Sequence, residues 1–287
     1  MKIGFLFFIA LCCARLSFAQ SLKNETSKKF VIGTVDTIQS GILGEKRIVN
    51  IYLPDDYSPD AANGYPVIYL LDGGADEDFV HIVGLVKYFT TSWVNRFSPS
   101  IVVGIENVNR RRDFTFATSN LDFVTKTGFD KNSFPQHGGS PKFIAFIEKE
   151  LQPFIQSHYK TNASKTIIGE SLGGLLATEI LLKNPSLFNT YIIISPSLWW
   201  GDESLLAETP ALIKRSSRDS IKIYVGAAKK SEDGVMYRDA QNLALLLKKY
   251  EHQNISVSFD YLANETHATI IHQAVYNAFK LLNPEKK

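Results

Sequence analysis

Short apolar runs alternate with longer stretches of helical periodicity along most of this chain. Uninterrupted apolar runs are typical of parallel strands whose two faces are both covered. They occur at Val67–Leu71, Ile101–Ile105, Thr166–Ile168, Tyr191–Ile194 and Ile221–Val225, and Ile255–Leu262 follows with a more alternating pattern. Two β-rich segments come before them and predict an antiparallel hairpin at the sheet edge, Val31–Gln39 and Arg47–Leu53.

Helical periodicity fills the gaps between the predicted strands. In 140–157 the apolar residues form one stripe, with Ser140 as the expected N-cap and Pro141 at the first position. Regular alternation of strands and helices predicts an α/β fold, a doubly wound and mostly parallel sheet with helices on both faces. In such sheets ligands bind at the carboxyl ends of the strands, so each catalytic candidate should follow a strand.

The first residues have a different character. Lys2, an apolar run that ends at Cys13, and Ser17-Phe18-Ala19 predict a cleavable secretory signal peptide at 1–19. The run is too short for a membrane span. A polar flexible leader at 20–30 and one domain at 31–287 would follow.

Removal of that segment changes the composition in two ways. Both cysteines would be lost, which excludes disulfides, thiol catalysis and cysteine metal sites in the mature chain. Without Lys2 and Arg15, 29 basic residues would balance 29 acidic ones. A neutral chain offers no electrostatic argument for binding nucleic acid or an anionic membrane.

The most specific motif is Gly169-Glu170-Ser171-Leu172-Gly173-Gly174, which lies between an apolar run and a helical segment. Strand, Gly-x-Ser-x-Gly and helix in this order are typical of the nucleophile elbow of an α/β-hydrolase. Small neighbours are needed because the serine occupies a tight, strained turn. The pattern predicts Ser171 as the nucleophile.

The partners of the serine should follow in the order acid, then histidine. Of the six histidines, only His267 follows the last predicted strand closely, and we expect it to be the general base. The acid should follow Ile221–Val225. Glu232 is the preferred candidate there, and Asp233 is the alternative because it could equally cap the next helix.

An ester-cleaving site also needs two backbone donors for the oxyanion. The N–H of Leu172 and the N–H of Gly74, with Gly73 close behind, are the candidates. The run Asp76-Glu77-Asp78 could bind a cation but is interpreted as a solvated helix start. No pair of histidines has HExxH-type spacing, so no metal and no cofactor are expected. His81 is interpreted as solvated or packed, and His272 as structural.

Several strings together resemble the putative esterase family, which contains esterase D-like, ferric-siderophore and feruloyl esterases. The resemblance covers about residues 31–283 and is carried by YLLDGG (69–74), GIENVNRRRDFT (104–115), GGSPKFIAFIEKELQPFI (138–155), IIGESLGGLLA (167–177), NPSLFNTYIIISPSLWW (184–200) and ETHAT (265–269). It implies an α/β-hydrolase fold and serine carboxylic-ester hydrolysis, with Ser171 and His267 matching the nucleophile and base. The siderophore branch usually has histidine where this chain has Glu170.

The same resemblance suggests substrate contacts. Arg112 matches an arginine of the loop over the site, where it either forms a structural ion pair with Asp113 or meets an anionic substrate group. Trp199 and Trp200 match an aromatic pair that either walls the acyl pocket or packs. Independently of the resemblance, the position of His137 in the loop before Ser140 makes it either a further substrate contact or simply a loop residue.

The leading hypothesis is an exported serine esterase that forms an acyl-enzyme with a small-molecule ester, such as a siderophore lactone, an aryl ester or a small acyl ester. An acyltransferase on the same fold and a non-catalytic binding module are the alternatives.

Overall fold

The computed structural model describes residues 27–213, 220–251 and 254–285, and the predicted signal peptide at 1–19 lies outside them. Residues Gly33–Lys287 form one compact unit, the larger of the two into which the chain divides. Residues 27–33 have no regular secondary structure, so the first strand begins at Thr34 rather than at Val31. Within the described ranges, no helix has the length and apolar character needed to cross a bilayer.

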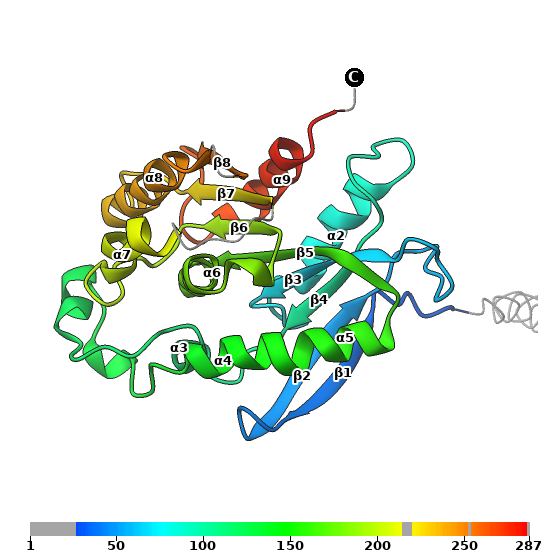
Figure 1. The fold of residues 1–287 in the computed structure, drawn as a ribbon, viewed down its shortest axis with the longest axis horizontal. Coiled ribbons are helices and arrows are strands. Elements are labelled where there is room, and N and C mark those ends of the chain that lie inside the picture. Colours follow the sequence, from blue (N-terminus) through cyan, green and yellow to red (C-terminus); the bar gives the residue numbers. More distant parts are fainter. Residues whose placement is uncertain (1–26, 214–219, 252–253, 286–287) are drawn as a thin grey trace, which may run out of the picture. The chain divides into compact units, whose positions relative to one another are not determined.

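The larger unit is built on an eight-stranded sheet with the order β1-β2-β4-β3-β5-β6-β7-β8 (Figure 1). β2 is antiparallel to both of its neighbours, and the other neighbouring strands are parallel. The predicted N-terminal hairpin is therefore present. The strands are β1 (Thr34–Ser40), β2 (Glu45–Tyr52), β3 (Tyr65–Leu71), β4 (Ile101–Ile105), β5 (Thr161–Glu170), β6 (Thr190–Ile194), β7 (Ile221–Ala227) and β8 (Ile255–Tyr261).

Helices cover both faces of the sheet, as the apolar runs predict. Side chains alternate between two cores, so that Ile167 packs on one face and Ile168 on the other. One core receives α2 and α9, and the other receives α4, α5, α6 and α8 (Figure 1). The helices are α2 (Phe79–Thr90), α3 (Arg110–Asp113), α4 (Ser140–Phe146), α5 (Gln152–His158), α6 (Leu172–Lys183), α7 (Ser204–Ile213), α8 (Gly234–Lys248) and α9 (Ile270–Leu282).

Short 3₁₀ turns complete the connections, at η1 (Asp122–Thr127), η2 (Lys131–Ser133) and η4 (Pro185–Leu187). The first two belong to the long segment between β4 and α4.

The helix expected over 140–157 differs from the prediction in two details. Gly139, not Ser140, is the N-cap residue, because the Ser140 hydroxyl is buried and donates to Glu179 Oε2 at 2.6 Å. A π-helical turn, η3 (Ile147–Leu151), separates α4 from α5. Pro153 follows this turn and has no N–H to donate, which favours such an irregularity.

Candidate active site

The turn between β5 and α6 carries Ser171 in a strained conformation. Its backbone angles are φ 58° and ψ −119°, which a side chain rarely adopts. A Cβ atom at Gly169 would lie 2.4 Å from the carbonyl oxygen of Gly173, and one at Gly174 would lie 2.9 Å from that of Ile194. The glycines are therefore required by close backbone contacts.

Hydrogen bonds hold this turn against the neighbouring strand. The Ser171 N–H donates to the Ile194 carbonyl, and the Ser171 carbonyl accepts from the Ser197 N–H, both at 3.0 Å. Ser197 Oγ lies 3.3 Å from Ser171 Oγ and is buried. Sequence reasoning missed Ser197, although its place directly after β6, the neighbour of β5, is a usable signal.

A cavity of about 320 Å³ opens at Ser171. Most of its polar lining follows the carboxyl ends of β5, β6, β7 and β8, which are consecutive neighbours in the sheet. The lining residues are Arg110, Arg111, Phe129, Phe134, Ser171, Leu172, Ser197, Trp199, Glu232, Asp233, Met236 and His267. The predicted nucleophile, base and both acid candidates thus meet in one place.

The two acid candidates have different contacts. Glu232 Oε2 accepts from the backbone N–H of His267 at 2.9 Å, which ties the histidine loop to the loop after β7. Asp233 Oδ1 accepts from the Met236 N–H at 2.9 Å and caps α8. Burial lowers the pKa of His267, whereas Asp233 and, to a smaller extent, Glu232 raise it. The imidazole is therefore neutral at pH 7, as a general base must be.

Of the expected oxyanion donors, Leu172 lies at the cavity, whereas the N–H groups of Gly73 and Gly74 are already hydrogen-bonded within the protein. Leu172 lines the cavity in the first turn of α6, where a helix leaves its N–H groups without an internal acceptor. Gly74 does not line the cavity. Its N–H donates to Glu77 Oε2 at 2.7 Å, and that of Gly73 donates to the Ile105 carbonyl at 3.0 Å. Gly74 could serve as a donor only if the Glu77 carboxylate moved away.

Glu170 precedes the predicted nucleophile, and its Oε1 is buried and lacks a hydrogen-bond partner among the described residues. Burial, reinforced by the carboxylates of Asp78 and Asp72, raises the pKa of Glu170 to about 8 despite the nearby Arg110. The side chain is therefore mostly protonated at pH 7. A neutral group beside Ser171 avoids repelling the negative charge that forms during ester cleavage.

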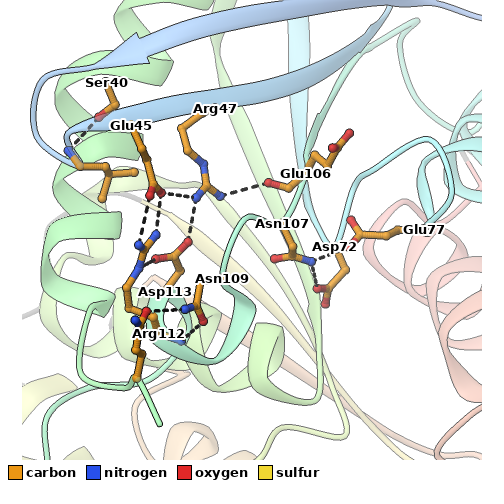
Figure 2. Close-up of polar contacts among 12 residues, drawn as sticks. Ser40, Glu45, Arg47, Asp72, Glu77, Glu106, Asn107, Asn109, Arg112 and Asp113 are labelled. Atoms are coloured by element: carbon orange, nitrogen blue, oxygen red, sulfur yellow. Dashed lines mark hydrogen bonds and ion pairs between the residues drawn. The ribbon is translucent and has the colours of Figure 1, made fainter. Parts of the chain in front are cut away.

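Arg112 does not line the cavity. Its guanidinium is bound by Glu45 at 2.6 Å and by Asp113 at 2.7 Å, and the same two carboxylates bind Arg47 (Figure 2). These contacts raise the pKa of Arg112 and lower that of Glu45. Of the two roles suggested for Arg112, the geometry matches the structural ion pair.

The neighbouring arginines face the cavity instead. Arg110 forms a two-pronged ion pair with Asp72, with Nε 2.6 Å from Oδ1 and Nη2 2.8 Å from Oδ2. Arg111 is exposed, donates to the Ser133 carbonyl and lies 5.1 Å from the centre of the Phe134 ring. No ion pair to Arg111 occurs among the described residues, so its charge is available to a ligand.

Of the two tryptophans, one lines the cavity and the other is buried in the core. Trp199 lines the cavity and stacks on Phe129 with 5.7 Å between ring centres. Trp200 is fully buried, and its indole N–H donates to the Phe116 carbonyl at 2.9 Å. His137 packs edge-on against Trp200, with 5.8 Å between ring centres, and is absent from the cavity lining.

The chain is similar to proteins that are named as siderophore esterases. The ferri-bacillibactin esterase BesA of Bacillus subtilis is 29% identical over 277 residues, which cover 91% of this chain and 93% of BesA. The siderophore triacetylfusarinine C esterase of Aspergillus fumigatus is 28% identical over 159 residues, which cover 54% of this chain and 52% of that enzyme.

Two solved structures have a fold similar to that of this chain. An IroE-like serine hydrolase from Shewanella oneidensis superimposes with a TM-score of 0.78 at 28% identity, over 88% of this chain and 80% of that one. The BES protein from Bacillus cereus gives a TM-score of 0.79 at 26% identity, over 91% of this chain and 100% of that one. A model of the putative esterase family matches residues 40–272. The chain therefore belongs to the putative esterase family and is a carboxylic-ester hydrolase with the α/β-hydrolase fold.

Proposed function

We propose that this protein is an exported serine esterase that hydrolyses ester bonds of a siderophore through an acyl-enzyme intermediate. The observation that carries the reaction is the meeting of Ser171, His267 and two carboxylates in one cavity. The substrate class is supported by the two relatives described above, which are named as esterases of ferri-bacillibactin and triacetylfusarinine C.

In this mechanism, Ser171 Oγ attacks the ester carbonyl while its proton passes to His267. The Leu172 N–H and the positive end of α6 stabilise the oxyanion of the tetrahedral intermediate. When that intermediate collapses, the leaving alcohol takes the proton from His267, and the acyl group remains on Ser171. Water then attacks the acyl-enzyme in the same way and releases the acid.

The carboxylates of Asp233 and Glu232 act on the charge of His267 and assist the base. A negative charge beside the imidazole stabilises the imidazolium that forms in each transition state. Asp233 has the larger effect on the pKa of His267, whereas Glu232 holds the backbone of its loop. Both are therefore proposed to support catalysis, one mainly through charge and the other mainly through position.

The rest of the lining suits a flat, anionic substrate group. Arg111 offers a positive charge, and Trp199, Phe129 and Phe134 offer ring faces and edges. Catecholate and other aryl groups of siderophores combine both properties. A cavity of about 320 Å³ is near the lower end of ligand-site volumes, so it would admit one arm of a large chelate at a time.

A substrate panel tests this proposal. The protein would be assayed with a catecholate trilactone, p-nitrophenyl esters of increasing chain length and methyl ferulate, and kcat/KM compared. We expect the trilactone to have the highest kcat/KM. Turnover of p-nitrophenyl acetate without any trilactone cleavage would leave the esterase assignment intact but contradict the siderophore as substrate.

Export rests on the sequence of residues 1–19 alone. We propose cleavage after Ala19, which would give a mature chain that begins at Gln20. Intact-mass measurement on the protein recovered from cell fractions checks this. A full-length mass in the cytoplasmic fraction alone would contradict it.

A further inference from the structure

We propose a binding site for a zinc-class divalent metal ion at Asp78, His81 and His272, outside the catalytic cavity. One ligand atom from each residue lies within 4.8 Å of the others. His272 Nε2 is 2.9 Å from His81 Nδ1, and His81 Nδ1 is 3.9 Å from Asp78 Oδ1. The two histidines are 191 positions apart, so no local spacing rule could detect the pair.

The three residues come from the starts of two packed helices. Asp78 precedes α2 but makes no side-chain capping bond, so its carboxylate is not used by the helix. His81 lies in the first turn of α2, and His272 lies in the first turn of α9. Phe89 of α2 contacts both Tyr276 and Phe279 of α9, which fixes the two helices against each other. A rigid scaffold of this kind holds ligand atoms in place before the ion arrives.

The donor set points to a transition metal. Two imidazole nitrogens and one carboxylate oxygen suit zinc, copper or nickel, whereas calcium and magnesium prefer oxygen alone. A tetrahedral zinc ion with bonds of about 2.0 Å separates two nitrogen ligands by about 3.3 Å. The imidazoles would have to part by only a few tenths of an ångström. The His81 side chain is 57% exposed, so water can supply the remaining ligand.

The local charge also favours a cation. The carboxylates of Asp72 and Glu77 lie close enough to act on Asp78. Arg110 is bound to Asp72 and neutralises part of this charge. The simpler alternative is a hydrogen bond between the two imidazoles without any metal.

The site is separate from the reaction centre. None of its three residues lines the cavity at Ser171, although His272 follows His267 by only five residues. Metal bound here would link α2 to α9, so its main effect should be on stability rather than on the chemical step.

Metal binding to the untagged, chelator-treated chain tests the proposal. Calorimetry with zinc should give one equivalent bound, and Tm should rise by about 5 °C when free zinc exceeds Kd a hundredfold. Cobalt should give the visible absorption of a four-coordinate site. His81→Ala and His272→Ala should each weaken binding at least tenfold, and Asp78→Asn should weaken it less.

Two further variants serve as controls. His158→Ala removes an exposed histidine whose polar contacts stay within α5, and it should bind zinc like the wild type. His267→Ala should also retain binding. No uptake by the wild type, unchanged uptake by His81→Ala and His272→Ala, or loss in His267→Ala would each overturn the proposal.

Discussion

Two polar regions of this molecule differ in how completely their charges are paired. Around Arg47, the guanidinium groups of Arg47 and Arg112 and the carboxylates of Glu45 and Asp113 bind one another, although the buried Nε of Arg47 has no hydrogen-bond partner among the described residues (Figure 2). At and behind the cavity of Ser171, the serine is strained, Glu170 has an unpaired buried oxygen and Arg111 has no carboxylate partner among the described residues. The first region stabilises the fold, and the second leaves groups available for chemistry. Mutations should therefore affect stability in one region and turnover in the other.

The largest effect is expected at the nucleophile. Ser171→Ala should lower kcat by roughly 10⁴-fold, because the members of a triad act as a unit. Circular dichroism and Tm should stay close to the wild type, and an organophosphonate probe should no longer label the chain. Retention of a tenth of the activity, or unchanged labelling, would show that another residue is the nucleophile.

The two acid candidates come next. Asp233→Asn keeps the size of the side chain and removes the charge with the larger effect on His267. If it is the acid of the triad, kcat should fall by about 10⁴-fold. Glu232→Gln serves as the matched variant, and the reverse order of the two losses would favour Glu232. If neither change matters, the enzyme works with serine and histidine alone.

Substitutions in the ion-paired region around Arg47 should lower the free energy of unfolding. Asp113→Asn leaves the fully buried Arg47 with one fewer charged partner, which should cost about 3 kcal/mol and lower Tm by roughly 6 °C. kcat of the folded fraction should change little. A large loss of kcat without a change in Tm would mean that the two regions are not separate in function.

Arg111 and Arg112 are adjacent in the chain, but one belongs to the cavity and the other to the ion-paired region, so their substitutions should have different effects. Arg111→Ala should raise KM about fivefold for anionic esters and leave KM for neutral esters nearly unchanged, since a surface charge contributes about 1 kcal/mol. Arg112→Ala should lower Tm instead, without discrimination between the two ester classes. Equal effects on KM from both changes would contradict the placement of Arg111 at the substrate.

The smallest effect concerns Glu170. A carboxyl whose pKa is raised on folding binds more protons in the folded state, so stability falls as pH rises from about 4.5 to about 8. Glu170→Gln removes this dependence. Between pH 5 and pH 8 the Tm of the wild type should therefore fall by a few degrees more than that of the variant. Parallel Tm profiles would show that Glu170 is ionised in the folded protein.

The sequence predicts those features that depend on neighbours along the chain. The apolar runs predict the strands, and the motif around Ser171 predicts the elbow, because both follow from local sterics and burial. Contacts between distant segments do not follow from local sterics and burial, and the sequence did not predict them. Nothing near Arg112 shows that Glu45 will bind it, and nothing near Gly74 shows whether Glu77 or a substrate will accept its N–H. Ser197 and the His81–His272 pair likewise depend on sheet order and helix packing.

The backbone angles of Ser171 have a consequence for how this protein can change over generations. A positive φ is unfavourable for serine and costless for glycine, so the chain would gain stability if that side chain were lost. Selection for heat resistance alone would favour glycine at this position and, under the proposed mechanism, end the hydrolytic activity. The enzyme therefore persists only while selection on turnover outweighs selection on stability at residue 171.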